Sequence, residues 1–248
     1  MKKLIAVLAA LVMILSVAMA AAETIVVAFN PEYPPFESVG DDGSYIGYDV
    51  DLINAVAAKA GIEIAFEAMD FDAVISAVAT NPNTIGVSGI SITEERKLSV
   101  DFSEGYINAG LIVVVKKDSG YATVDDLKGK TIGVQMGTTS DFAAEDITGE
   151  ANTAKYKTFL NAIMELQGNK VDAVIVDKPV GMAILASLKD DNLEIVDMGL
   201  QADWYGIEVN KDNPDLLAKI NAALKELEAE GFYDELAVKY FSEEEAAE

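Results

Sequence analysis

The chain has 248 residues, of which 51% are hydrophobic and 24% charged, so it can fill the core of one large domain or two small ones. This composition excludes a disordered or fibrous chain. With 42 acidic against 18 basic residues the formal charge is −24, which argues against a nucleic-acid-binding surface. The sequence contains no histidine and no cysteine, which excludes Ser-His-Asp triads, cysteine nucleophiles, zinc sites built on these residues, and disulfides. Any chemistry must come from carboxylates, lysine, arginine, hydroxyls or the backbone.

The N-terminal segment has the pattern of a secretory signal peptide. Lys2 and Lys3 precede an apolar run at 4–17, and Ala18-Met19-Ala20 is a small-x-small cleavage motif, so we predict a signal peptide at 1–22. Because the apolar segment is almost long enough to span a bilayer, an uncleaved membrane anchor is the alternative interpretation. No cysteine follows the signal to carry acyl chains, so we expect a free periplasmic protein without a lipid anchor, with secretion to the medium as the alternative.

Short β-rich apolar runs alternate with helical patterns along the rest of the chain. We predict strands at 24–29, 62–66, 85–87, 111–115, 131–134, 171–176 and 193–196. Helices are predicted at 49–60, 71–79, 94–98, 140–147, 160–167, 214–230 and 232–241. This alternation predicts an α/β fold with mainly parallel sheets. Composition alone leaves open whether the chain forms one domain or two.

Nine short blocks carry more specific information. They are YPPF at 33–36, GYDVDL at 47–52, MDF at 69–71, SGISITEERK at 88–97, VDFS at 100–103, DDLKGK at 125–130, GTTS at 137–140, VDAVIVD at 171–177 and WYGI at 204–207. In their order and spacing, these blocks resemble the extracellular solute-binding proteins of ABC importers. The resemblance is to the polar amino-acid branch, which includes glutamine-, histidine- and lysine/arginine/ornithine-binding proteins.

The resemblance implies the two-lobe periplasmic-binding-protein fold (type II), an α/β fold with ligand in the cleft between the lobes. The first lobe would be discontinuous, with residues 23–105 plus 206–248, and the second would span 111–200. Two hinge crossings are expected, at 106–110 and 201–205. In such a fold, a ligand that touches both lobes stabilises the closed form.

One block departs from the family pattern. The turn before the central strand usually contains Gly-Lys-x-Asp, whereas this chain has Asn81-Pro82-Asn83-Thr84. The family position is structural, so we expect a local difference in structure or stability and not in function.

A free amino acid is a zwitterion and needs a planar cationic fork for its carboxylate and an acceptor for its ammonium. By resemblance, Arg96 is the fork, assisted by the Ser91 hydroxyl and the backbone N–H of Thr139. Asp177 would accept the ammonium, with the backbone carbonyl of Gly89. Without the resemblance, Arg96 is typical of a solvated helix charge and Asp177 of a helix cap.

The resemblance also implies which residues surround the ligand side chain. Tyr33 and Phe71 would sandwich it, although both could be plain core aromatics. Asn30 stands where several family members carry an acidic residue, so we expect a polar or uncharged amino acid first and a basic one next. Trp204 either lines the cleft or packs the hinge. The complete predicted ligand-binding set is Asn30, Tyr33, Phe71, Ser88, Gly89, Ser91, Arg96, Gln135, Thr138, Thr139 and Asp177.

The implied function is a non-catalytic binding protein that delivers an amino acid to a membrane ABC permease formed by separate chains. We expect a monomer that needs no metal or cofactor and binds no nucleic acid. An enzyme on the same scaffold, a periplasmic cyclohexadienyl (prephenate) dehydratase, is the alternative. Its candidate proton donors are Glu37, Glu145 and Asp177. A ligand-sensing domain for a separate receptor or kinase is a third possibility.

Overall fold

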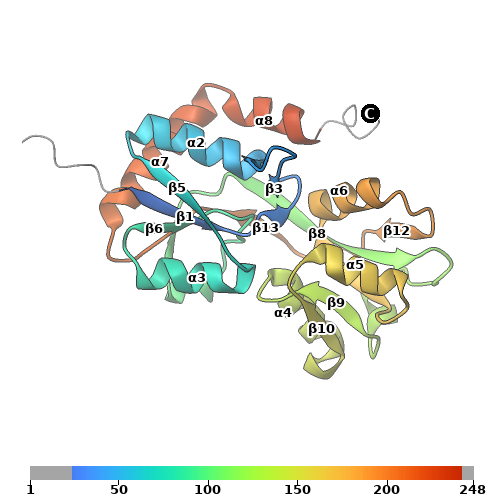
Figure 1. Ribbon diagram of the computed structural model, residues 1–248. Coiled ribbons are helices and arrows are strands. Elements are labelled where there is room, and N and C mark those ends of the chain that lie inside the picture. The colour runs from blue at the N-terminus through green and yellow to red at the C-terminus, as the bar shows by residue number, and fades with distance from the viewer. Residues whose placement is uncertain (1–23, 242–248) are drawn as a thin grey trace, which may run out of the picture.

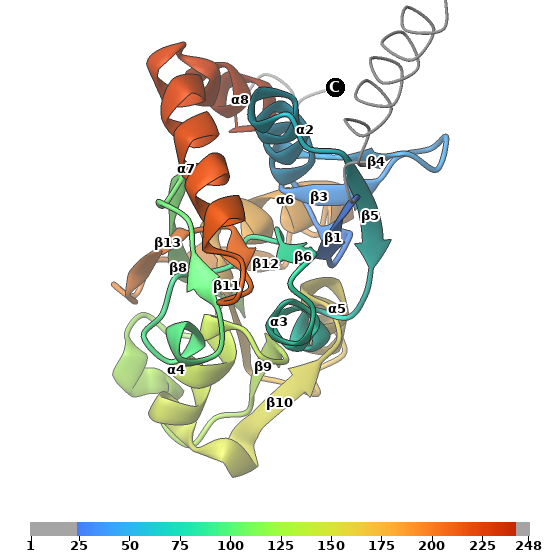
Figure 2. The ribbon, with the colours of Figure 1, turned by 90° about the vertical axis from the view of Figure 1, so that its left-hand side faces the viewer.

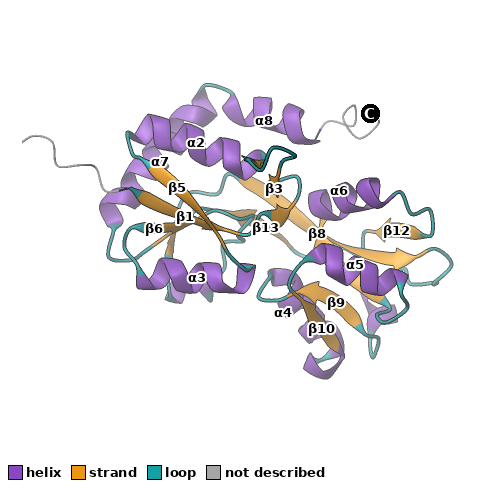
Figure 3. Cartoon of the chain, in the orientation of Figure 1, coloured by secondary structure: helices purple, strands orange, loops and turns teal. Residues whose placement is uncertain are grey.

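The computed structural model describes residues 24–241, and the predicted signal peptide at 1–22 lies outside this range. Two α/β lobes lie side by side, each built on its own sheet with helices on both faces (Figures 1 and 3). The predicted two-lobe α/β fold is thus confirmed. No helix between residues 24 and 241 is long and apolar enough to cross a membrane.

The first lobe contains a five-stranded sheet in the order β5-β1-β6-β14-β7. Its strands are β1 (Ile25–Phe29), β5 (Ile64–Ala68), β6 (Thr84–Gly86), β7 (Asp101–Phe102) and β14 (Glu208–Val209). β1 pairs in parallel with β5 and β6, whereas β14 runs antiparallel to β6 and β7. A late part of the chain therefore lies inside a sheet formed mostly by early strands.

Four helices cover this sheet: α2 (Tyr48–Ala60), α3 (Phe71–Thr80), α7 (Pro214–Ala229) and α8 (Phe232–Phe241). Helices α2, α7 and α8 lie on one face and α3 on the other (Figure 1), and α7 packs against α2 (Figure 2). Leu52, Ile53 and Val56 of α2 are fully buried, which confirms the stripe predicted from their spacing.

The second lobe contains a six-stranded sheet in which β10, β9, β11, β8 and β12 follow one another and β13 pairs with β8. Its strands are β8 (Ile107–Lys116), β9 (Ile132–Gln135), β10 (Thr153–Tyr156), β11 (Ala173–Asp177), β12 (Leu193–Val196) and β13 (Ala202–Tyr205). Its helices are α4 (Thr139–Thr148), α5 (Phe159–Gln167) and α6 (Lys178–Leu188). Alternate residues of β8 face opposite cores: Val113 packs with α4, and Val114 with α5 and α6.

Strand β8 pairs with β13 through its first residues and with β11 and β12 through its later ones. The β8/β13 ladder runs from Ile107↔Tyr205 to Gly110↔Ala202, so the segments predicted as crossings lie side by side. The prediction of mainly parallel sheets is wrong, because β8 and β14 pair antiparallel with their neighbours. Two adjacent segments that run between the lobes in opposite directions can only pair antiparallel.

Short elements complete the fold. A three-stranded sheet consists of β2 (Glu32–Tyr33), β3 (Glu37–Val39) and β4 (Tyr45–Ile46). Short 3-10 helices are η1 (Arg96–Leu98), η2 (Val124–Leu127) and η3 (Glu150–Asn152). The helix predicted at 94–98 is only the single turn η1, because no amphipathic stripe extends it. In the divergent turn before β6, Asn81 Oδ1 accepts the N–H of Asn83 at 3.0 Å. This turn is therefore stabilised by an asparagine side chain, where the family pattern has a glycine.

Candidate ligand-binding site

The predicted site residues come from both lobes and lie where the two sheets end. In the first lobe, Asn30 follows β1, Tyr33 lies in β2, Phe71 begins α3, Ser88, Gly89 and Ser91 follow β6, and Arg96 begins η1. In the second, Gln135 ends β9, Thr138 caps α4, Thr139 begins it, and Asp177 ends β11. Ligands of α/β folds bind outside the carboxyl ends of strands, and here four such ends face one gap.

Eight of these residues line one small cavity between the lobes: Tyr33, Phe71, Gly89, Ser91, Arg96, Thr138, Thr139 and Asp177. The cavity measures about 10 Å³, roughly the room of one water. Of the remaining three, Asn30 contacts both others: its N–H donates to Ser88 Oγ at 3.0 Å, and its Oδ1 accepts from Gln135 Nε2 at 3.2 Å. An amino acid can therefore enter only when the lobes separate.

Arg96 joins the two lobes. One terminal nitrogen donates to the Ser91 carbonyl at 2.8 Å, and the other donates to the Gly137 carbonyl of the second lobe at 2.9 Å. The guanidinium lies 5.5 Å from the centre of the Phe71 ring, a cation–π distance. Burial lowers the pKa of Arg96, while the carboxylates of Glu208 and Asp177 oppose this effect. The guanidinium has five N–H donors, so some remain for a ligand carboxylate.

Asp177 is the acidic side chain that the second lobe contributes to the cleft cavity. It is 3% exposed and accepts a hydrogen bond from the Tyr33 hydroxyl of the first lobe. The Tyr33 hydroxyl also lies 2.9 Å from that of Tyr205. Burial raises the pKa of Asp177 to about 6, and hydrogen bonds from the two tyrosines limit the rise. At neutral pH this carboxylate is ionised and can accept an ammonium group.

Gly89 is a glycine for steric reasons. Its φ is +54°, and a Cβ here would lie 2.4 Å from Tyr33 Cε1. Its N–H donates to Asp49 Oδ2 at 2.7 Å. The Gly89 backbone is therefore held directly beneath the Tyr33 ring, facing the cavity.

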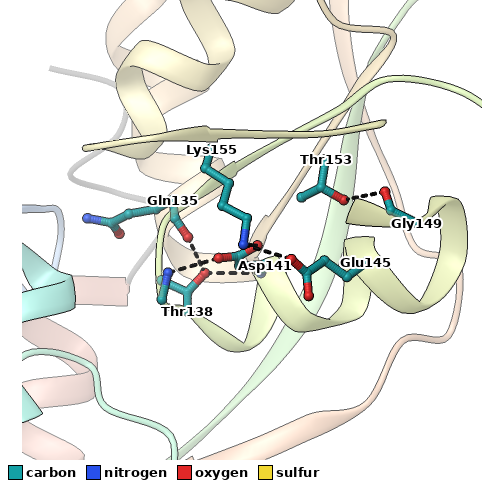
Figure 4. A network of polar contacts seen from close by, with 8 residues as sticks. Gln135, Thr138, Asp141, Glu145, Gly149, Thr153 and Lys155 are labelled. Carbon is teal, nitrogen blue, oxygen red and sulfur yellow. Dashed lines mark hydrogen bonds and ion pairs between the residues drawn. The ribbon is translucent and has the colours of Figure 1, made fainter. Parts of the chain in front are cut away.

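The start of α4 supplies the second-lobe side of the cleft. Thr138 Oγ1 accepts the N–H of Asp141 at 3.3 Å and donates to the Gln135 carbonyl at 2.8 Å (Figure 4). The Thr139 hydroxyl lies 3.4 Å from that of Ser91 in the first lobe. Since Thr139 begins the helix, its N–H belongs to the first turn, where backbone donors attract anions.

Glu145, a candidate proton donor in the enzymatic alternative, lies outside the cleft cavity. Its Oε1 is 2.7 Å from Lys155 Nζ, which also contacts Asp141 at 3.1 Å (Figure 4). The hydrogen bond from Lys155 to Glu145 raises the pKa of Lys155. Glu145 therefore ties α4 to β10 and does not face a ligand.

Asn30 and Gln135 form an amide pair across the lobes. Asn30 Nδ2 donates to the Met69 carbonyl at 3.0 Å, and Gln135 Nε2 donates to the Lys157 carbonyl at 2.8 Å. Gln135 Nε2 also lies 3.2 Å from Asn30 Oδ1. Gln135 Oε1 is buried and has no hydrogen-bond partner within residues 24–241. Both nitrogens are thus held by backbone of their own lobe, and the oxygens are the groups available to a ligand.

A buried carboxyl pair, Glu37 and Asp49, supports this site from behind. Glu37 accepts the Ser88 hydroxyl at 2.6 Å, and Asp49 accepts the Gly89 N–H and, at 2.8 Å, the Tyr106 hydroxyl. Burial raises the pKa of Glu37 well above its ordinary value and that of Asp49 to about 7, and the charge of Asp49 raises the pKa of Glu37 further. Two buried carboxyls that repel each other are costly to ionise together, so burial favours the protonated form of Glu37.

The predicted ligand-binding set contains neither carboxyl of this pair, and Glu37 entered the sequence analysis only as a candidate proton donor of the dehydratase alternative. Glu37 was expected as a loop carboxylate and Asp49 as the first residue of a helix. The signal that could have indicated them is their position in the sequence. Glu37 directly follows the YPPF block, and Asp49 lies within the GYDVDL block. Trp204 is 54% exposed and lines a surface groove with Ile92 and Gly105, so it packs beside the crossing and lies outside the cleft cavity.

A family model described as "Bacterial extracellular solute-binding proteins, family 3" matches residues 25–243. The chain belongs to this family, as the sequence motifs predicted. The ABC transporter arginine-binding protein 1 of Escherichia coli (strain K12) is 34% identical over 244 residues, covering 97% of this chain and 99% of the relative.

Solved structures extend this similarity. An ancestral arginine-binding protein bound to arginine is 38% identical, with a TM-score of 0.83 over 88% of this chain and 98% of that chain. The ancestral arginine-binding protein bound to glutamine is also 38% identical, with a TM-score of 0.82 over 89% and 98%. All three relatives are named for binding, so these comparisons give no support to the dehydratase alternative.

Proposed function

We propose that this protein captures a free L-amino acid between its lobes and delivers it to an ABC permease formed by separate chains. The observation that carries the proposal is a pair of buried, opposite charges on opposite lobes, Arg96 and Asp177. The α-carboxylate of an amino acid would bind Arg96, Ser91 and the Thr139 N–H. Its ammonium would bind Asp177, and no other arrangement of a zwitterion satisfies both charges.

The contacts that now join the lobes support a closure mechanism. Arg96 to Gly137, Tyr33 to Asp177 and Gln135 to Asn30 are polar contacts across the cleft. A ligand between the lobes would take over these donors and acceptors and contact both lobes at once, so binding would shift the protein toward the closed form. The β8/β13 pair at 106–110 and 201–205 would be the hinge, with lobes at 23–105 plus 206–248 and at 111–200.

The amide pair supports a ligand side chain that ends in planar N–H donors. Asn30 Oδ1 and Gln135 Oε1 are neutral acceptors, which suit an amide first and a delocalised guanidinium next. The compact ammonium of lysine is more strongly hydrated and would lose more on burial without a carboxylate. We therefore infer glutamine as the favoured ligand and arginine as the second. The two ligands seen with the ancestral relative agree with this pair.

The remaining parts of the proposal concern location and partners. Export through the N-terminal segment, with the free protein in a periplasm, is supported by the family description as extracellular. We further propose that the protein acts as a monomer and has no catalytic activity of its own.

A thermal-shift screen of the chain from Ala21 onward tests the function. The ligands would be the twenty amino acids, ornithine, citrulline, cystine and prephenate. We expect glutamine and arginine to stabilise the protein selectively, because ligand at 100 times its Kd adds ~2.7 kcal/mol to the free energy of unfolding. Silence across all amino acids would contradict the proposal, and a response to prephenate alone would favour the dehydratase alternative.

Asn30→Asp should move the preference from glutamine toward arginine and lysine. The new carboxylate would face the distal group of the ligand, where charge-assisted hydrogen bonds favour a cation by roughly 1–3 kcal/mol. Calorimetric Kd values for the three ligands would measure this shift. Asn54→Asp, on the exposed side of α2, is the matched control because it adds the same charge far from the cleft. An unchanged ranking in Asn30→Asp would refute the assignment of Asn30 to the distal subsite.

A further inference from the structure

Glu208 is a buried carboxylate that the proposed binding site does not use. It lies on β14, between β6 and β7 in the first-lobe sheet, and is 1% exposed. Neither carboxylate oxygen has a hydrogen-bond partner within residues 24–241. The side chain occupies the space over Gly86, where an added Cβ would lie 2.6 Å from Glu208 Oε2. A carboxylate without partners in this position is costly unless a nearby cation or a proton neutralises it.

The nearby cation that can neutralise the Glu208 carboxylate is Arg96. Glu208 and Arg96 line a second cavity of about 240 Å³, whose apolar wall includes Phe71, Val74 and Ile90. Arg96 lines both this cavity and the cleft cavity, so it stands between Glu208 and the proposed ligand carboxylate. Burial raises the pKa of Glu208 to about 7, and the charge of Arg96 opposes the rise.

Few other charges face this group. Asp72 of α3 and Glu95 line the same cavity at its rim, where both are partly or fully exposed. Asp101 of β7 pairs with Val209, the residue next to Glu208. Helix α7 presents buried Leu216 and Ile220 to the lobe interior, and β6 carries no titratable residue. Arg96 is thus the cation whose field acts on Glu208.

We propose that Glu208 takes up one proton from solution when the carboxylate of an amino acid binds Arg96. Without ligand, the guanidinium charge stabilises ionised Glu208. The ligand carboxylate neutralises that charge, so the buried Glu208 carboxylate binds H⁺ and becomes a neutral carboxylic acid. Glu208 is therefore a positioning residue that acts through Arg96 and couples affinity to pH. This inference rests on the proposed function.

The sign of the coupling separates Glu208 from Asp177. A group that gains a proton on binding makes the complex weaker as pH rises, in the limit by about tenfold per pH unit for one proton. Asp177 would act in the opposite direction, because a bound ammonium favours its ionised form, and its pKa of about 6 places that effect at lower pH. At pH 7 to 8 the contribution of Asp177 is therefore small. Asp49 also has a pKa of about 7, but it accepts the Gly89 N–H and the Tyr106 hydroxyl and lines neither cavity with Arg96, so the difference between the wild type and Glu208→Gln isolates Glu208.

Titration calorimetry with L-glutamine and L-arginine, in phosphate and in Tris buffer at pH 7.0, 7.5 and 8.0, tests the proposal. Proton uptake makes the binding heat depend on the ionisation heat of the buffer. We expect a substantial fraction of one proton to be taken up by the wild-type protein, with a Kd that rises with pH. Glu208→Gln should bind without uptake and with a Kd that is nearly independent of pH, whereas Glu95→Gln should behave as the wild type.

Each outcome is informative. Binding without proton uptake in the wild type, or uptake that persists in Glu208→Gln, overturns the role of Glu208 and leaves the proposed function intact. No binding of either amino acid overturns the proposed function and this inference with it. If Glu208→Gln fails to fold, infrared difference spectra of the wild type decide the matter. Addition of ligand should produce the C=O band of a protonated carboxyl, and its absence would refute the proposal.

Discussion

Arg96→Ala should weaken amino-acid binding by roughly 2–5 kcal/mol, which corresponds to a Kd about 30-fold to several thousand-fold higher. The reason is that Arg96 is 8% exposed, so the ligand carboxylate would be buried without its counter-charge. The substitution also removes the donors to the Ser91 and Gly137 carbonyls, one of which joins the lobes. Calorimetry with glutamine and arginine would measure the loss.

Two further variants separate the role of Arg96 from general effects of charge. Lys97→Ala removes an adjacent positive charge that is exposed and paired with Glu94, so it should leave the Kd unchanged. Arg96→Lys keeps the charge but loses the planar fork and should recover only part of the affinity. Circular dichroism would establish that each variant is folded. Full affinity in folded Arg96→Ala would refute the assigned site.

The free energy of unfolding should fall as the pH rises from about 5 to about 8. Burial raises the pKa of four carboxyl groups in the folded state: Glu37, Asp49, Asp177 and Glu208. Each group binds its proton more tightly in the folded protein than in the unfolded chain. Its stabilising contribution is therefore complete below the unfolded pKa and is lost as the pH rises through the folded pKa. Each fully titrating group contributes up to about 1.4 kcal/mol per pH unit within its window.

Urea unfolding at pH 5, 6.5 and 8 would measure this slope. Glu37→Gln should reduce it, because the amide oxygen can still accept from Ser88 while one titrating carboxyl is removed. Glu63→Gln, on the exposed surface, is the matched control and should keep the wild-type slope. The exposed carboxyls with lowered pKa values, Asp42, Asp126 and Asp190, act below about pH 4 and so outside this range. Stability that increases toward pH 8 would contradict the prediction.

These two predictions concern linked parts of one site. Arg96 carries the charge that a ligand would use, whereas the Glu37–Asp49 pair holds the Ser88–Gly89 backbone that faces the same ligand. Because burial raises the pKa values of these carboxyls, we expect the folded protein to be most stable at mildly acidic pH. Because we expect the Kd to rise with pH, the thermal-shift screen should give its clearest ligand response near pH 7 and a smaller one at pH 8.

Local sequence patterns determined much of the fold. The stripe of α2, with Leu52 and Val56, and the apolar run that becomes β11 each follow from periodicity that a single segment contains. Asp177 could be placed at a strand end for the same reason, because it directly follows four buried residues of β11. The family resemblance carried by the joint motifs then suggested eleven ligand-binding residues, eight of which line the cleft cavity. Such predictions succeed when the information lies within one element or one block.

Only the tertiary structure decided the parts that depend on distant segments. Strand β14 has two residues and no period to detect, and it enters the first sheet only because β6 and β7 leave a position between them. That placement buries Glu208 on the far side of Arg96, although the two residues lie far apart in the sequence. The raised pKa values of Glu37 and Asp49 likewise arise from two carboxyls that the fold brings together and removes from water. Burial and proximity set the pKa of a carboxyl, and a linear sequence contains neither quantity.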